Sequence, residues 1–136
     1  MPFPVDEQWI LETEDKLGVA FPASFKVMMK RLNGGHIFAA DDTWNLYPFL
    51  DRSELKRIKR TCNDIVHETQ FSRTCYGFPE DAVAIAGNGS GDQLVFLPDP
   101  NNPKQLLRTV FFHNHENGDV TEVADDFADI KRYDTK

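Results

Sequence analysis

LLRTVFFHNHENGDVTEV, residues 106–123, holds two apolar runs with a polar stretch between them. Asn117-Gly118 lies in that stretch, and this dipeptide favours the type I′ turn, in which both central residues need positive φ. The pattern therefore predicts a β-hairpin with strands at 106–112 and 120–123. A tight hairpin makes the sheet that contains it antiparallel.

Two further strands are predicted at 82–86 and 93–97, where short apolar runs replace the helical period of the earlier sequence. Between them lies the glycine-rich segment GNGSGD, residues 87–92. A phosphate-binding loop would need a lysine after the glycines and a helix behind them, and a calcium loop would need several carboxylates. This segment has a single carboxylate, Asp92, and leads into a strand, so we interpret it as a chain reversal.

The N-terminal part of the chain has the period of amphipathic helices. A first helix is predicted from a cap at Asp6 to Gly18, because apolar residues recur there at helical spacing. A second helix is predicted to begin at Pro22 and to end at Asn33-Gly34-Gly35. Two short helices joined by so tight a turn must share a core.

A third helix is predicted after Asp51, which would form a capping box with Glu54. Its inner face would carry Leu55, Ile58, Cys62, Ile65 and Val66. Its other faces carry a dense basic cluster, Lys56, Arg57, Lys59 and Arg60. This cluster is either a solvated helix surface or a patch that binds an anion or a partner. A terminal helix is predicted at 125–132.

Helices followed by strands and a final helix indicate an α+β fold. We expect a twisted antiparallel sheet with helices packed mainly on one face. The 136 residues match the size of one domain, and no repeat, low-complexity segment or long linker divides them. We therefore expect residues 1–136 to form a single domain.

The formal net charge of −7 disfavours broad nucleic-acid binding, which depends on lysine and arginine, and favours a basic protein partner. Two cysteines, Cys62 and Cys75, are too few for a disulfide framework and suit a reducing compartment. The sequence shows neither a signal-peptide pattern nor eighteen consecutive apolar residues. We therefore expect a cytoplasmic protein that binds neither membranes nor nucleic acid directly.

The predicted hairpin contains the residues with the most chemical potential. His113 and His115 are two residues apart, so on a strand both side chains would face one way and could chelate a metal ion. Glu116 and Asp119 could complete such a site, or they could pair across the hairpin or face water. Spacing fixes no third ligand, and the alternative role for His115 is a hydrogen bond near the turn.

Two aromatic residues, Trp44 and Tyr47, follow an Asp41-Asp42 turn between short strands predicted at 36–39 and 44–46. Tryptophan and tyrosine are favoured at protein interfaces, although core packing of Trp44 is the alternative. Taken with the acidic and polar residues of the later turns, they define a candidate partner-binding set: Asp41, Asp42, Trp44, Tyr47, Asp92, His115, Glu116 and Asp119.

Five short motifs follow one another along the chain: LGVAFPASF at 17–25, LNGG at 32–35, IAGNGSGD at 85–92, HE at 115–116 and VADDF at 123–127. In this order and spacing they closely resemble the SUKH superfamily, in the branch named for the yeast Smi/Knr cell-wall synthesis regulators. Phe21 stands before Pro22 where that family usually has leucine, which keeps the position apolar. The resemblance spans nearly the whole chain.

The resemblance implies an α+β fold with a twisted antiparallel sheet, no catalytic residues and no cofactor. Bacterial members are similar to immunity proteins that bind and neutralise polymorphic toxins, often nucleases, whereas fungal members act as regulatory interaction proteins. We therefore expect a non-enzymatic protein-binding domain, in first place a cytoplasmic immunity protein with a basic toxin as its partner. The alternatives are a regulatory scaffold without a toxin partner and a metal-dependent enzyme at His113 and His115.

Overall fold

A computed structural model describes residues 2–132 of the chain. Its helices are α1 (Glu7–Leu17), α2 (Ala23–Arg31), α3 (Leu55–Thr61), α4 (Ile65–Ser72) and the short 3-10 helix η1 (Phe127–Asp129). Its strands are β1 (Gly35–Ala39), β2 (Asp42–Leu46), β3 (Val83–Gly87), β4 (Gln93–Phe96), β5 (Pro98–Asp99), β6 (Asn102–Leu106), β7 (Val110–His113), β8 (Val120–Ala124) and β9 (Lys131–Arg132). Within these residues, every helix falls short of the length and apolar character of a membrane span.

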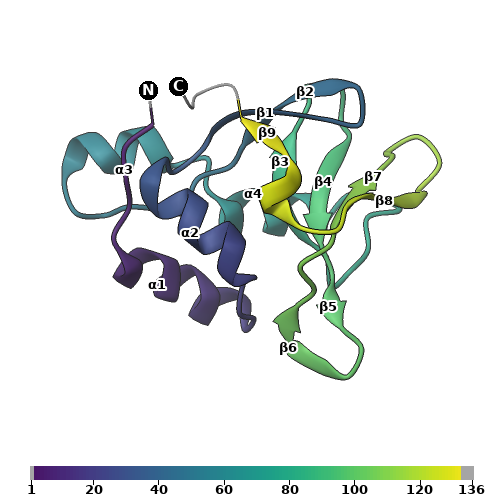
Figure 1. Cartoon of the computed structure of the whole chain (residues 1–136), viewed down its shortest axis with the longest axis horizontal. Coiled ribbons are helices and arrows are strands. Elements are labelled where there is room, and N and C mark those ends of the chain that lie inside the picture. Colours follow the sequence, from purple (N-terminus) through teal and green to yellow (C-terminus); the bar gives the residue numbers. More distant parts are fainter. Residues whose placement is uncertain (1, 133–136) are drawn as a thin grey trace.

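Seven strands form a curled antiparallel sheet in the order β8-β7-β4-β3-β2-β1-β9, and β5 and β6 form a separate hairpin. The helices α1, α2 and α3 lie together on one side of the molecule, and α4 packs on β3 (Figure 1). The predicted α+β fold is confirmed. The strand predicted at 106–112 is divided, because β6 ends at Leu106 and β7 begins at Val110.

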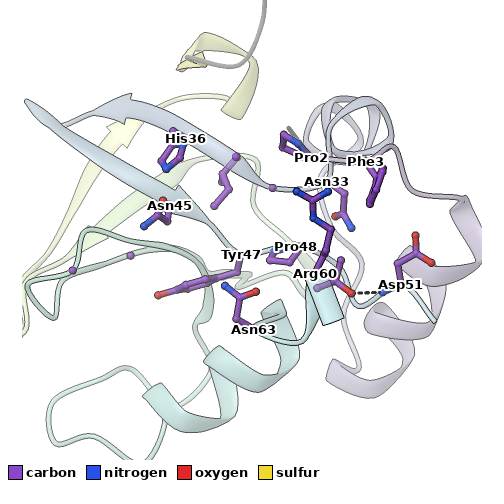
Figure 2. A pocket seen from close by; sticks show the side chains of 16 residues that line it. Pro2, Phe3, Asn33, His36, Asn45, Tyr47, Pro48, Asp51, Arg60 and Asn63 are labelled. Carbon is purple, nitrogen blue, oxygen red and sulfur yellow. Dashed lines mark hydrogen bonds between the residues drawn. The ribbon is translucent and has the colours of Figure 1, made fainter. Parts of the chain in front are cut away.

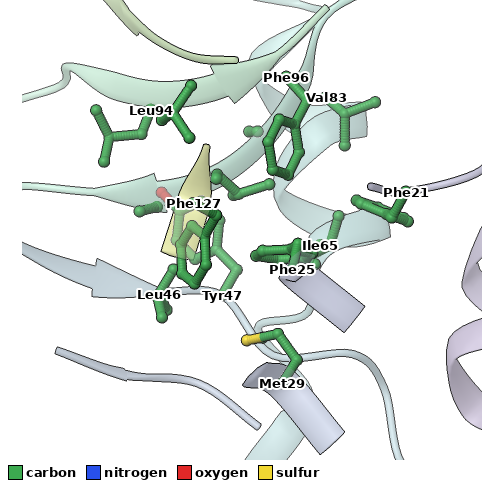
Figure 3. Packing of buried hydrophobic residues seen from close by; sticks show 14 of the residues in the cluster. Phe21, Phe25, Met29, Leu46, Tyr47, Ile65, Val83, Leu94, Phe96 and Phe127 are labelled. Atoms are coloured by element: carbon green, nitrogen blue, oxygen red, sulfur yellow. The ribbon is translucent and has the colours of Figure 1, made fainter. Parts of the chain in front are cut away.

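A cluster of phenylalanine rings fills the space between the helices and the sheet (Figure 3). The ring of Phe25 in α2 lies 4.8 Å from Phe127 and 5.1 Å from Phe96, and Phe21 lies 5.2 Å from Phe49. All five are at most 2% exposed, and these three contacts are edge-on, as aromatic pairs prefer. Because the rings come from distant segments, they join the N-terminal helices to the strands.

The two N-terminal helices form where predicted, although Asp6, at the cap position of α1, makes no side-chain capping hydrogen bond. α1 ends at Gly18, whose φ of 72° is left-handed, and α2 follows Pro22 directly. The segment after α2 is fixed by Asn33, which is buried. Its side-chain amide donates to the Phe49 carbonyl, and its Oδ1 accepts from the Phe49 amide, both at 2.8 Å. This paired contact sets the position of β1 relative to the loop after β2.

The predicted third helix is wrong in its extent, because the chain forms two helices there. Asp64 interrupts it and caps α4 by accepting a hydrogen bond of 3.1 Å from an amide in the first turn. Cys62, predicted to face inward, is exposed. Leu55 is 67% exposed and Ile58 37% exposed, so α3 lies on the surface.

The capping box predicted for Asp51 and Glu54 is also wrong. Glu54 occupies the position before α3, and its side chain makes no capping hydrogen bond. Asp51 is buried, and its carboxylate accepts from the amide of Ser53 at 3.0 Å and from Arg57 at 3.4 Å. Asp51 therefore holds the loop before α3 against the helix instead of starting it.

The predicted terminal helix is reduced to the single turn η1, which Asp126 caps by accepting from a backbone amide at 2.9 Å. The chain then extends as β9 and pairs with β1. Arg132 is buried and donates to the carbonyl oxygens of Leu32, at 3.1 Å, and Gly34. Pairing with a distant strand thus replaces the local helical hydrogen bonds.

The predicted β7–β8 hairpin is confirmed, but its turn is not a two-residue turn at Asn117-Gly118. The connection runs from Asn114 to Asp119, and the amide of Gly118 donates to the carbonyl of Asn114 at 2.8 Å. Two consecutive positive φ values occur instead at Ala40-Asp41, 50° and 59°, between β1 and β2. The positive φ pair that a type I′ turn requires therefore belongs to the β1–β2 hairpin.

Candidate functional site

Three hairpin connections meet at one end of the sheet, away from α1 (Figure 1). They are the β1–β2 turn at Ala40-Asp41, the β3–β4 loop at 88–92 and the β7–β8 loop at 114–119. They share this end because β2 pairs with β3 and β4 pairs with β7 next to these connections. We call their polar residues the loop rim: Asp41, Asp42, Asn88, Asp92, His115, Glu116 and Asp119.

Asn88 joins the two halves of the loop rim. Its side-chain amide donates to Asp42 at 3.0 Å and to Asp92 at 3.3 Å. Asp92 in turn accepts from the backbone amide of His115 at 3.0 Å and from its ring Nδ1 at 2.6 Å. The structure thus brings together three predicted site residues, Asp42, Asp92 and His115, through a residue that the sequence interpretation had treated only as part of a turn.

Asp92 is the rim carboxylate with a resolved change in pKa. Partial burial by itself raises the pKa of Asp92, but hydrogen bonds from the ring and backbone of His115, and one from Asn88, outweigh burial and lower the pKa below its ordinary value. Donors favour the ionised form because they stabilise its negative charge. Asp92 is therefore a fixed anion that positions the His115 ring.

Gly91 makes room for that ring. It has a φ of 103°, and a Cβ atom at this position would lie 3.0 Å from Cγ and Cδ2 of His115. A side chain at this position would therefore press on the imidazole and force it to shift by a few tenths of an ångström. The β3–β4 loop is the chain reversal that the sequence predicts, and it also shapes the neighbouring β7–β8 loop.

The remaining acidic rim residues face solvent. Asp41, Glu116 and Asp119 are exposed. The backbone beneath the last two is held by the side chain of Asn114, which accepts from the Glu116 amide at 2.9 Å, and by Asn117, which accepts from the Asp119 amide at 2.8 Å. These short turns present carboxylates on a fixed loop, which suits electrostatic recognition of a basic surface.

Of the two aromatic candidates, Trp44 takes the alternative of core packing, and Tyr47, a candidate for an exposed interface position, is buried too. Trp44 is 0% exposed, its Nε1 donates to the Ala39 carbonyl at 2.8 Å, and its ring lies 5.6 Å from Phe112. Tyr47 is 8% exposed, and its hydroxyl donates to Gln93 at 2.9 Å. Burial raises the pKa of Tyr47 to about 12. Both residues belong to the hydrophobic core, so neither lies on the exposed surface of the loop rim.

His113 and His115, the residues of the metal hypothesis, are held by different partners. His113 is 3% exposed and its Nε2 donates to the Gly77 carbonyl at 3.0 Å, because a carbonyl oxygen only accepts. The ring of His115 binds Asp92 instead. Within residues 2–132, no group of three or more His, Cys, Asp or Glu side chains is placed to hold a metal ion.

The basic cluster of α3 holds the N-terminal segment. The charged groups of Arg57, Arg60 and Lys56 lie 4.6, 4.9 and 5.6 Å from the centre of the Phe3 ring, within the range of cation–π attraction. Arg57 also donates to the Pro4 carbonyl at 3.2 Å. Three of the four basic side chains thus have an intramolecular role that the sequence did not predict.

A polar pocket of about 510 Å³ lies beside this contact (Figure 2). Arg60 stands on one side of it, and the ring of Tyr47 with Asn63 on the other, below His36 and Asn45 from the β1–β2 hairpin. The guanidinium group of Arg60 disfavours a basic ligand here, and the carboxylate of Asp51, which also lines the pocket, is already paired with Arg57. We therefore place the candidate surface for a basic partner at the loop rim and not at this pocket.

The fold and the rim define a class of protein, a small α+β domain whose acidic turns converge at one end of an antiparallel sheet. The chain matches the SMI1 / KNR4 family (SUKH-1) over residues 4–132. It therefore belongs to that family, and the resemblance read from the motifs is confirmed. Comparisons with curated proteins and with solved structures gave no significant match.

Proposed function

We propose that the chain is a non-enzymatic protein-binding domain, of the bacterial immunity type, that neutralises a basic toxin domain such as a nuclease by binding it. It would act in the cytoplasm, and residues 1–136 would form one domain. Membership of the SMI1 / KNR4 family supports protein binding as its role. The net charge of −7 supports a basic partner.

The observation that carries the proposal is the convergence of carboxylates on the loop rim. Asp92 is ionised and locked in place by its donors. Asp41, Glu116 and Asp119 stand exposed around it. Charges fixed in this way attract a basic surface as it approaches. Binding then loses little conformational entropy in these loops, because the turns are already hydrogen-bonded.

The first experiment is a pull-down from the native organism with this protein as bait, in which the product of each neighbouring gene is scored at low and moderate salt. We expect stoichiometric capture of a basic domain, and weaker capture as salt screens the charges. Retention of regulatory proteins, with no basic partner, would instead favour the regulatory scaffold.

A charge-matched pair of variants then locates the surface. Asp41→Asn with Asp42→Asn removes two charges from the rim, and Asp15→Asn with Glu54→Gln removes two from exposed positions on the helical side. At ~0.5 kcal/mol for each exposed charge, the rim variant should associate about fivefold more slowly. Equal association rates for the two variants would remove Asp41 and Asp42 from the binding surface.

A further inference from the structure

A small pocket opens beside the loop rim, between the end of α4 and the strands. It is lined by Phe71, Ser72, Cys75, Tyr76, Phe78, Gly91, Gln93, His113 and His115, and we call it the aromatic pocket. Its volume is about 290 Å³. This volume is at the lower end of the roughly 300–1,000 Å³ that ligand sites enclose, and it has room for a single large side chain.

Two walls of the aromatic pocket are formed by exposed aromatic side chains. Phe71 is 62% exposed and Tyr76 is 101% exposed, although most large apolar side chains of the chain are in the core. On the inner side, Phe78 packs edge-on against His113 at 5.2 Å and gives the pocket a firm floor. Exposed aromatic residues around a hollow are typical of the energetic centre of a protein interface.

The aromatic pocket is continuous with the loop rim. His115 belongs to both, since its ring lines the pocket while its Nδ1 binds Asp92. Gly91 also lines the pocket and lies in the β3–β4 loop, next to Asp92. A partner that covers the rim carboxylates is therefore brought to the mouth of the pocket.

We propose that the aromatic pocket receives one large apolar side chain from a basic loop of the protein partner, whose lysine or arginine residues contact the loop rim. This proposal rests on the proposed function and names the chemistry of the partner. The rim accounts for attraction, and the pocket accounts for a slow dissociation, because a buried anchor excludes water at the centre of the contact.

The chain carries a reporter and a matched control for this proposal. Cys75 lines the aromatic pocket, whereas Cys62 lies at the end of α3, outside it. Both thiols are exposed, and each lies near a backbone carbonyl of the helix that precedes it, at 3.7 Å for Cys75 and 3.5 Å for Cys62. A ligand in the pocket should therefore shield Cys75 alone from an alkylating reagent.

The probe is a capped peptide with lysines on both sides of one tryptophan, and its control has alanine in place of the tryptophan. Mass spectrometry follows alkylation of each cysteine by iodoacetamide. We expect excess tryptophan peptide to slow alkylation of Cys75 about fivefold and to leave Cys62 unchanged, while the alanine peptide protects neither. Equal rates at Cys75 with both peptides would overturn the proposal.

Variants test the same pocket with the basic protein captured in the pull-down. Phe71→Ser and Tyr76→Ser should each weaken binding about tenfold, whereas Leu11→Ser, at another exposed apolar position, on α1, should not. Unchanged affinity in both pocket variants would overturn the anchor and leave the proposed function standing. Protection of Cys75 by the tryptophan peptide, with no basic partner captured in the pull-down, would instead overturn the proposed function and leave the anchor site in the pocket standing.

Discussion

Replacing Gly91 with alanine should break the link between the β3–β4 and β7–β8 loops. Alanine at a φ of 103° is strained by ~1–3 kcal/mol, and its Cβ would press on the His115 ring at 3.0 Å. The ring must then shift by a few tenths of an ångström, which weakens its hydrogen bond to Asp92. A bond to a charged group contributes ~1.5–3 kcal/mol when sheltered, and we take ~1 kcal/mol here because the His115 side chain is 41% exposed.

Gly89 provides the control within the same loop. Its φ of 84° imposes similar strain on alanine, but nothing lies within 4 Å of its added Cβ. Gly91→Ala should therefore be less stable than Gly89→Ala by ~1 kcal/mol, which moves the urea midpoint by about 0.5 M at a typical slope. Coincident unfolding curves for the two variants would refute the argument that His115 is held by the space at Gly91.

Trp44→Ala should reduce the free energy of unfolding by ~3–5 kcal/mol in urea, while the folded fraction binds a partner at the normal rate, because Trp44 is fully buried. Asp92→Asn should lower the free energy of unfolding at neutral pH. A carboxylate whose pKa is lowered by folding contributes stability above its unfolded pKa and loses that contribution as the pH falls through its folded pKa, so the deficit of the variant should shrink below about pH 3.8. A deficit that stays constant from pH 7 to pH 2 would contradict this. Phe3→Ala should speed hydrogen exchange at the amide of Val5 and cost ~1–2 kcal/mol through lost cation–π contacts, and unchanged exchange would show that Phe3 does not hold the segment.

Local patterns were sufficient for much of the fold. The first two helices and the strand at 82–86 form as predicted, because periodicity and turn residues act over a few neighbours. The segment at 125–132 failed because its end pairs with β1, and Arg132 binds carbonyls some 100 residues away in sequence. Asp64 was a readable cap signal in the middle of the predicted third helix, but the apolar spacing around it suggested continuity.

The site was predictable in its chemistry but not in its assembly. Acidic residues in turns indicated a charged surface, yet the contact between Asp42 and Asp92 through Asn88 depends on the order of strands in the sheet, which no local pattern contains. The burial of Trp44 was readable, because residues of β2 alternate and Trp44 shares its inward face with Leu46. Core packing was accordingly one of the two alternatives for Trp44, whereas nothing local indicated the burial of Tyr47.

The loop rim contains two kinds of position with different freedom to diverge. Glu116 and Asp119 project from turns into solvent, so each can be replaced singly and change what the surface prefers while the scaffold stays intact. Gly91 and the His115–Asp92 pair constrain one another sterically and electrostatically. When such a protein acquires a new partner, the exposed acidic residues should therefore change one at a time. Gly91, Asp92 and His115 should change only together.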